Sequence, residues 1–177
     1  MSTVQTRRAR VSATMPLGRR PRRAVLVTHI LSASAWIGID VVVAILVATS
    51  FIADDTQTQA VAYQALGMVA VWPMFIAGVC CLVTGVLLGL GTKYGLLRMW
   101  WVTIKLCLNI ALATLILLAL RPGVNDLGEY GRGVLAGEAP SPVDTSGMGF
   151  PPIVSLTALS VAVLLSVFKP WGRIRQS

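Results

Sequence analysis

One histidine and one aspartate interrupt the first long apolar segment of this 177-residue chain, in the stretch THILSASAWIGID. The histidine, His29, is the only one in the sequence, and the aspartate is Asp40. An ionisable side chain at membrane depth is costly unless it pairs with another group, meets water or serves a function. Positions 29, 33, 36 and 40 share one side of a helix, so His29, Trp36 and Asp40 are expected to face the protein interior.

A second group of polar residues occurs in the apolar stretch WWVTIKLCLN, where Trp101, Lys105 and Asn109 follow one another at intervals of four. This spacing places all three on one face of a helix. Lys105 can either extend its long side chain to the membrane surface or meet an anion inside the protein. Asn109 lies one turn deeper and is better placed than Lys105 to contact Asp40.

Counting residues from the flanking arginines gives the depth of each ionisable group. At a rise of about 1.5 Å per residue, His29 lies about 9 Å from Arg23, and Lys105 lies about 10.5 Å from Arg98. Asp40 lies about 25 Å from Arg23 by the same count. We therefore expect His29 and Lys105 at a similar level near the cytoplasmic side, and Asp40 closer to the outer face.

Each ionisable residue has a structural interpretation beside the functional one. His29 is either a hydrogen-bonded core residue or a ligand or proton carrier. Asp40 is either a protonated carboxyl that hydrogen-bonds within the bundle, or a site for a proton, an ion or a partner. Of the five tryptophans, Trp36 is the least typical of the aromatic belts found at membrane interfaces.

Composition places the chain among integral membrane proteins. Hydrophobic residues make up 55% of the sequence and charged residues only 12%. The net charge of +8 arises from basic residues beside apolar segments, where it is typical of a topology signal and does not indicate nucleic-acid binding. The three cysteines lie in apolar runs without ligand spacing, and we interpret them as packing residues.

Four segments are long and apolar enough to span a bilayer, which predicts an all-α, four-helix membrane bundle. These helices are expected at about 25–52, 61–91, 99–120 and 150–168. They form a transmembrane domain over 24–169, between a basic tail at 1–23 and a short tail at 170–177.

The distribution of basic residues predicts the orientation of the four helices. Seven arginines and no acidic residue precede residue 24. Lys93 and Arg98 lie in the second connection, and Lys169, Arg173 and Arg175 follow the last helix. The positive-inside rule therefore places both termini in the cytoplasm.

Glycine and proline predict the local irregularities. Pro73 should kink the second helix or delay its start. Beyond it, Gly78, Gly85 and Gly89 share one face and allow another helix to approach closely. The outer loop 121–149 is rich in glycine and is expected to be largely irregular, serving as a connector, a lid or a docking surface.

The motifs in the first and third helices resemble those of a group of small bacterial membrane proteins. His29 followed by Trp36 and Gly38, and Trp101 followed by Lys105, are similar to a pattern in the haem-associated protoporphyrinogen oxidase. The same group contains the copper-resistance D domain and a four-helix family of unknown function, which the chain resembles most. The similarity covers the first three predicted helices and implies a location in the bacterial cytoplasmic (inner) membrane.

The resemblance and the matched depths together suggest a cofactor site near the cytoplasmic end. With a single histidine, a haem b would be held by His29 together with a Met, a Lys or a residue of another chain, or would be five-coordinate. His29 is a predicted metal ligand only in this role as a haem ligand. Lys105 or Arg98 would meet the propionates. Trp36 and Trp101 complete the predicted cofactor-binding residues.

Two classes of function follow from these features. In the first, the protein is associated with haem or a quinone and takes part in redox or porphyrin handling, with Asp40 and Asn109 as a proton or partner site. In the second, it is a non-catalytic membrane subunit or scaffold. Its partners would be the lipid bilayer and either further copies of itself or a larger membrane complex.

Overall fold

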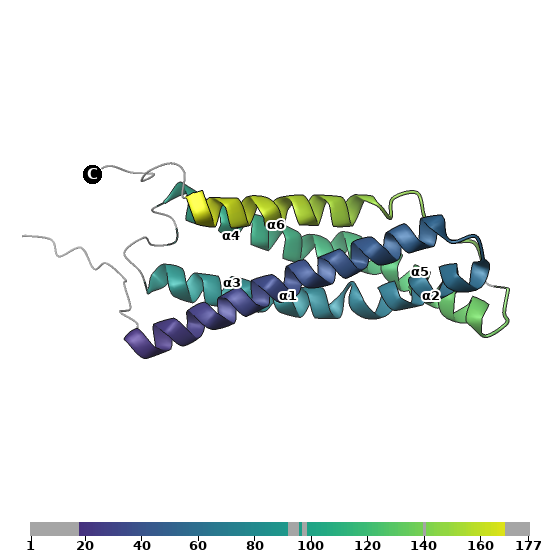
Figure 1. Ribbon diagram of the computed structural model, residues 1–177, viewed down its shortest axis with the longest axis horizontal. Helices are drawn as coiled ribbons and strands as arrows, with labels where there is room; N and C mark the ends of the chain where they lie inside the picture. The colour runs from purple at the N-terminus through teal and green to yellow at the C-terminus, as the bar shows by residue number, and fades with distance from the viewer. Residues whose placement is uncertain (1–17, 92–95, 97–98, 140, 169–177) are drawn as a thin grey trace, which may run out of the picture.

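A computed structural model describes residues 18–91, 96, 99–139 and 141–168. The basic residues of the second connection and of the C-terminal tail, which support the predicted orientation, lie outside these ranges. The described residues form helices and no strand (Figure 1). In chain order they are α1 (Arg19–Ile52), α2 (Thr56–Val69), α3 (Trp72–Leu90), α4 (Trp100–Leu115), the π-helix η1 (Ile116–Leu120), α5 (Arg121–Leu135) and α6 (Phe150–Phe168).

These elements combine into four helices long and apolar enough to cross a membrane, which confirms the predicted all-α class within the described residues. The second of these helices comprises α2 and α3, and the third comprises α4, η1 and α5. The beginning of α1 and the end of α6 lie at the same end of the bundle (Figure 1). Helix α1 runs diagonally along the bundle and contacts α2, α3 and α6.

The second membrane-length helix is interrupted at Ala70 and Val71, between α2 and α3. Pro73 occupies the first turn of α3, where its missing N–H costs no helical hydrogen bond. The predicted effect of this proline is therefore confirmed. The helix nevertheless begins at Thr56, five residues earlier than expected, because the Asp55 carboxylate accepts a hydrogen bond from the Thr58 N–H (2.7 Å) and caps it.

The expectation of an irregular outer loop from residue 121 was wrong for its first half, which forms α5. Two of the glycines that argued against a helix, Gly128 and Gly131, form its packing surface against α2. A Cβ at Gly128 would lie 3.1 Å from the Cα of Gly67 on α2, and a Cβ at Gly131 would meet the Ala60 carbonyl. Close contact between α2 and α5 stabilises a helix whose intrinsic propensity is low.

The core follows the inner face of α1 along most of its length. Trp36 is fully buried, and Asp40 is only 1% exposed, as the helical spacing predicted. The buried apolar residues from the other helices around this face include Leu66, Val71, Met74, Cys81, Leu112, Ile116, Val124 and Leu127.

Candidate functional site

His29 projects from α1 and is half-buried against α3, to which it makes its hydrogen bonds. Its Nδ1 lies 3.1 Å from the carbonyl oxygen of Cys81 and 3.0 Å from the Thr84 hydroxyl oxygen. These partners belong to the second membrane-length helix, whereas the neighbour expected from the matched depths, Lys105, belongs to the third. Most of the polar contact is supplied by the second helix.

The partners of His29 determine which ring nitrogen carries the hydrogen. The Cys81 carbonyl can only accept, and the Thr84 hydroxyl donates its own hydrogen to the Cys80 carbonyl oxygen at 2.6 Å. Nδ1 of His29 must therefore donate to both oxygens. The neutral ring then presents a lone pair at Nε2, for which the described residues supply no hydrogen bond.

Lys105 and Asn109 lie beside His29, as the matched depths of His29 and Lys105 predicted. They line a recess of about 60 Å³ together with His29, Cys81 and Gly85. The Lys105 ammonium donates to the Ser166 hydroxyl on α6 (2.9 Å) and lies 4.9 Å from the centre of the Trp101 ring. We refer to His29, Cys81, Thr84, Lys105 and Asn109 as the histidine layer.

Two of the three glycines in the predicted packing strip contact α1. A Cβ at Gly78 would lie 2.9 Å from two carbons of the Trp36 ring, and a Cβ at Gly85 would lie 3.2 Å from Cε1 of His29. The third, Gly89, faces the side chain of Leu96. The strip therefore accommodates the two large side chains of α1 and is covered within the chain itself.

Asp40 lines a different cavity, on the other side of Trp36 along α1. This cavity, of about 130 Å³, lies among α1, α3, α4, η1 and α6, and we call it the aspartate cavity. The Ser155 side chain on α6 lines the same cavity and neighbours the Asp40 carboxyl. The Oδ2 atom of Asp40 is buried and has no hydrogen-bond partner among the described residues.

Asn109 does not contact the aspartate cavity. It lies in the recess of the histidine layer, where its side chain neighbours Cys81. Asn109 shares one face of its helix with Leu112 and Ile116, which do line the aspartate cavity, so it lies on the same side of the helix but at the level of the histidine layer. The polar residue that lines the aspartate cavity with Asp40 is Ser155, in the fourth membrane-length helix.

A π-helical turn forms one wall of the aspartate cavity. Ile116, Ala119 and Leu120 of η1 all line it, and the N–H of Arg121 bonds to the carbonyl of Ile116, five residues earlier. Pro122 follows and has no N–H to continue the regular ladder. Such turns are frequent at functional sites, because the extra residue changes where side chains point.

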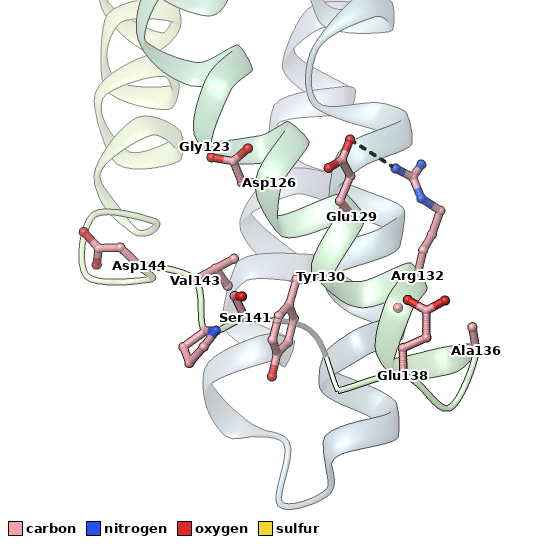
Figure 2. A pocket seen from close by; sticks show the side chains of 12 residues that line it. Gly123, Asp126, Glu129, Tyr130, Arg132, Ala136, Glu138, Ser141, Val143 and Asp144 are labelled. Carbon is pink, nitrogen blue, oxygen red and sulfur yellow. Dashed lines mark ion pairs between the residues drawn. The ribbon is translucent and has the colours of Figure 1, made fainter.

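A third concave region lies at the end of the bundle that holds α2 and α5. It is an open cleft of about 840 Å³ between α5 and the segment that follows it (Figure 2). Four carboxylates and one guanidinium line it, and the guanidinium of Arg132 lies 3.8 Å from the carboxylate of Glu129. The charged residues of this outer cleft are Asp126, Glu129, Arg132, Glu138 and Asp144.

Sequence reasoning missed three polar residues of these sites. Cys81 and Thr84 supply the oxygens that hold His29, and Ser155 neighbours Asp40. A carbonyl acceptor leaves no signal in a sequence, and isolated Ser and Thr are common in membrane helices.

No protein-family model, curated protein or solved structure matches this chain. The described residues also contain no group of three or more His, Cys, Asp or Glu side chains that could hold a metal ion. The histidine layer and the aspartate cavity are therefore the two candidate sites within the bundle.

Proposed function

We propose that this multi-pass membrane protein takes part in redox or porphyrin handling, with haem b or a quinone as its cofactor and His29 as the residue that binds it. The observation that carries this proposal is the pair of hydrogen bonds from Nδ1 to the Cys81 carbonyl and the Thr84 hydroxyl. Histidines that bind metals commonly donate their second ring N–H to such an acceptor, which orients the ring and leaves Nε2 for the metal.

The electrostatic surroundings of His29 support an anionic ligand at this end of the bundle. Arg19, Arg22 and Arg23 precede it by about two to three turns of α1 and line a recess of about 360 Å³. Lys105 lies within the histidine layer itself. These cations suit carboxylates such as haem propionates, and the positive-inside rule assigns this end to the cytoplasm.

Nε2 of His29 is a suitable ligand for a haem iron, but the recess beside it is too small to enclose a haem. The recess beside His29 holds about 60 Å³, whereas cofactor sites usually provide about 300–1,000 Å³. A haem on His29 would therefore extend beyond this recess, toward lipid or a second copy of the chain. The haem would supply one-electron chemistry, while the chain orients its ligand and neutralises its propionates.

The direct test is a reduced-minus-oxidised absorption spectrum of the full chain, purified in mild detergent from cells supplied with haem precursor. We expect Soret and α bands in the wild type and none in His29→Ala, because the only histidine has been removed. Thr84→Val should retain the bands with altered intensity or position, since it removes one acceptor and keeps the ligand. A wild-type spectrum retained in His29→Ala would exclude His29 as the haem ligand.

A second function, that of a subunit or scaffold in a larger membrane complex, has a different observation in its favour. The outer cleft is wide and open, and its four carboxylates outnumber its single guanidinium. It suits a basic segment of a partner protein. Because the glycine strip is occupied by Trp36 and His29, the cleft is the surface on which we base this alternative.

Purification without colour but with a stoichiometric second chain would favour the subunit function. Charge reversal of Asp126 and Glu138 to Lys should then release that chain, while His29→Ala should not. The paired outcome separates the two proposals, because they depend on opposite ends of the bundle.

A further inference from the structure

The aspartate cavity is the second observation that demands a chemical explanation, and it is independent of the role of His29. Asp40 is 1% exposed, and its Oδ2 has no hydrogen-bond partner among the described residues. A buried acceptor without a donor destabilises the fold, because it has lost its hydrogen bonds to water and gained none in return. Buried polar groups of this kind are rare in native proteins and call for a specific reason.

We propose that the aspartate cavity binds a phenolic ring, such as the head group of a lipid-soluble hydroquinone, whose hydroxyl donates a hydrogen bond to the Asp40 carboxyl. Three properties of the cavity support the binding of such a ring. They are its size, the chemistry of its walls and its position at the surface of the bundle.

The size of the cavity corresponds to a single six-membered ring. Its volume is about 130 Å³, and an apolar cavity of about 150 Å³ in another protein accommodates benzene. Apart from Asp40 and Ser155, the lining is apolar. Met74, which is almost completely buried, adds a thioether to the wall, and sulfur makes favourable contacts with aromatic rings.

The walls favour a neutral donor. No Lys, Arg or His is among the described residues that line the cavity, so this lining offers no cation to Asp40. An ionised carboxylate accepts at both oxygens, and a protonated carboxyl still accepts at one. A phenol hydroxyl can therefore donate to Asp40 in either state, and it crosses a bilayer without the cost of carrying a charge.

The position of the cavity allows entry from the membrane. Two of its lining residues, Leu115 and Phe150, are 49% and 71% exposed on the surface of membrane-length helices. A ring could enter between α4 and α6 while an apolar tail remained in the lipid. Ser155, in the first turns of α6, lies next to Asp40 and can receive or donate a second hydrogen bond.

Binding can be measured by ¹⁹F NMR with the full chain in lipid nanodiscs, with empty nanodiscs as the reference for partitioning. The two probes are 4-fluorophenol and 4-fluorotoluene, which differ only by a hydroxyl in place of a methyl group. We expect a saturable bound signal for 4-fluorophenol, with one site per chain, and binding about tenfold weaker for 4-fluorotoluene.

Two variants assign this preference to the cavity. Asp40→Leu should remove the preference for the phenol, because leucine has a similar size and cannot accept a hydrogen bond. Val154→Phe should abolish binding of both probes, because the larger side chain fills the cavity. Equal binding of the two probes by the wild type would overturn the proposal without requiring any variant to fold, as would a preference that persists in Asp40→Leu.

The source of the ring is distinguished by competition in the same nanodiscs. Displacement of 4-fluorophenol by decylhydroquinone would support a hydroquinone with a lipid tail, and failure to displace it would support a small free phenol. Displacement by benzylamine at lower concentration than by phenol would overturn the phenolic assignment in favour of a cation. None of these outcomes depends on haem, so failure here is separable from failure of the function proposed for His29.

Discussion

His29 and Asp40 lie on the same helix, 11 residues apart, yet the protein surrounds them in opposite ways. His29 is held by two oxygens of α3, and its neighbour Lys105 is held by Ser166 of α6. Asp40 has one neighbouring hydroxyl, one oxygen without a partner and an apolar cavity. The bonds at Nδ1 fix the orientation of the His29 ring and leave Nε2 for a ligand, whereas the Asp40 carboxyl has an oxygen without a partner and a cavity beside it.

Trp36 separates these two environments, and the largest expected effect comes from disturbing it. In Gly78→Ala the new Cβ would lie 2.9 Å from the Trp36 ring, so α1 and α3 would have to move apart. We expect the free energy of unfolding to fall by about 1–3 kcal/mol, as in other overpacked cores. Denaturation in mixed micelles, followed by tryptophan fluorescence, measures this change.

Gly38→Ala is the matched control, because a Cβ at Gly38 has no neighbour within 4 Å. We expect this variant to be as stable as the wild type, or more stable by up to about 1 kcal/mol through helix propensity. Equal losses of stability in the two variants would contradict the packing of Trp36 against Gly78.

Replacing Asp40 should have the next largest effect, and its sign is the opposite. Asp40→Leu removes a buried acceptor and adds apolar contacts in the cavity, so the free energy of unfolding should rise on the order of 1 kcal/mol. The measurement is the same denaturation assay, without added ligand. Ser155→Ala serves as the control and should lower stability slightly, because it leaves Asp40 with less hydrogen bonding. A large loss of stability in Asp40→Leu would show that Asp40 has a structural partner.

His29→Leu should lower the free energy of unfolding where Asp40→Leu raises it. The substitution removes the hydrogen bonds to the Cys81 carbonyl and the Thr84 hydroxyl. Hydrogen bonds between membrane helices contribute about 0.6 kcal/mol on average. The double variant His29→Leu with Thr84→Val should therefore lose less than the sum of the single losses. Strict additivity would show that the two side chains do not interact.

The smallest expected effect concerns the cap of α2, at the end of the bundle away from His29. The backbone N–H of Thr58 donates to the Asp55 carboxylate and holds the pKa of that exposed carboxyl below its ordinary value. A lowered pKa contributes stability that is present above the unfolded value and is lost as the pH falls through the folded value. We expect α2 to fray slightly below about pH 4.

Hydrogen exchange at the Thr58 amide as a function of pH measures this fraying. Asp55→Asn should keep the cap and remove the pH dependence, because asparagine accepts the same hydrogen bond without titrating. Asp54→Asn should leave the profile of the wild type unchanged. An unaltered profile in Asp55→Asn would assign the pH dependence to another group.

The sequence predicted the helices more successfully than their contacts. The four membrane-length helices, the break before Pro73 and the burial of Trp36 and Asp40 were all expected from hydropathy, proline chemistry and helical spacing. Helix α5 was not, because glycine usually opposes a helix and only the facing glycine of α2 turns it into a packing residue.

The sequence also predicted some contacts of the candidate sites and missed others. Equal depths brought His29 and Lys105 to one layer, as the structure has them. Asn109 was expected to be better placed than Lys105 to contact Asp40, but the polar residue that shares its cavity is Ser155 on α6. A depth count gives one coordinate of a side chain, whereas a contact also requires the rotation of each helix and the order of the helices around the bundle.

The sequence by itself therefore determined the membrane class, the number of membrane-length helices and the face of α1 that turns inward. It could do so because lipid requires each spanning segment to satisfy its own backbone hydrogen bonds and to expose apolar side chains. Only the tertiary structure decided that the Cys81 carbonyl holds Nδ1 of His29 while Asp40 borders a cavity. These outcomes depend on backbone atoms and on the packing of helices distant in the chain, which no local pattern of residues specifies.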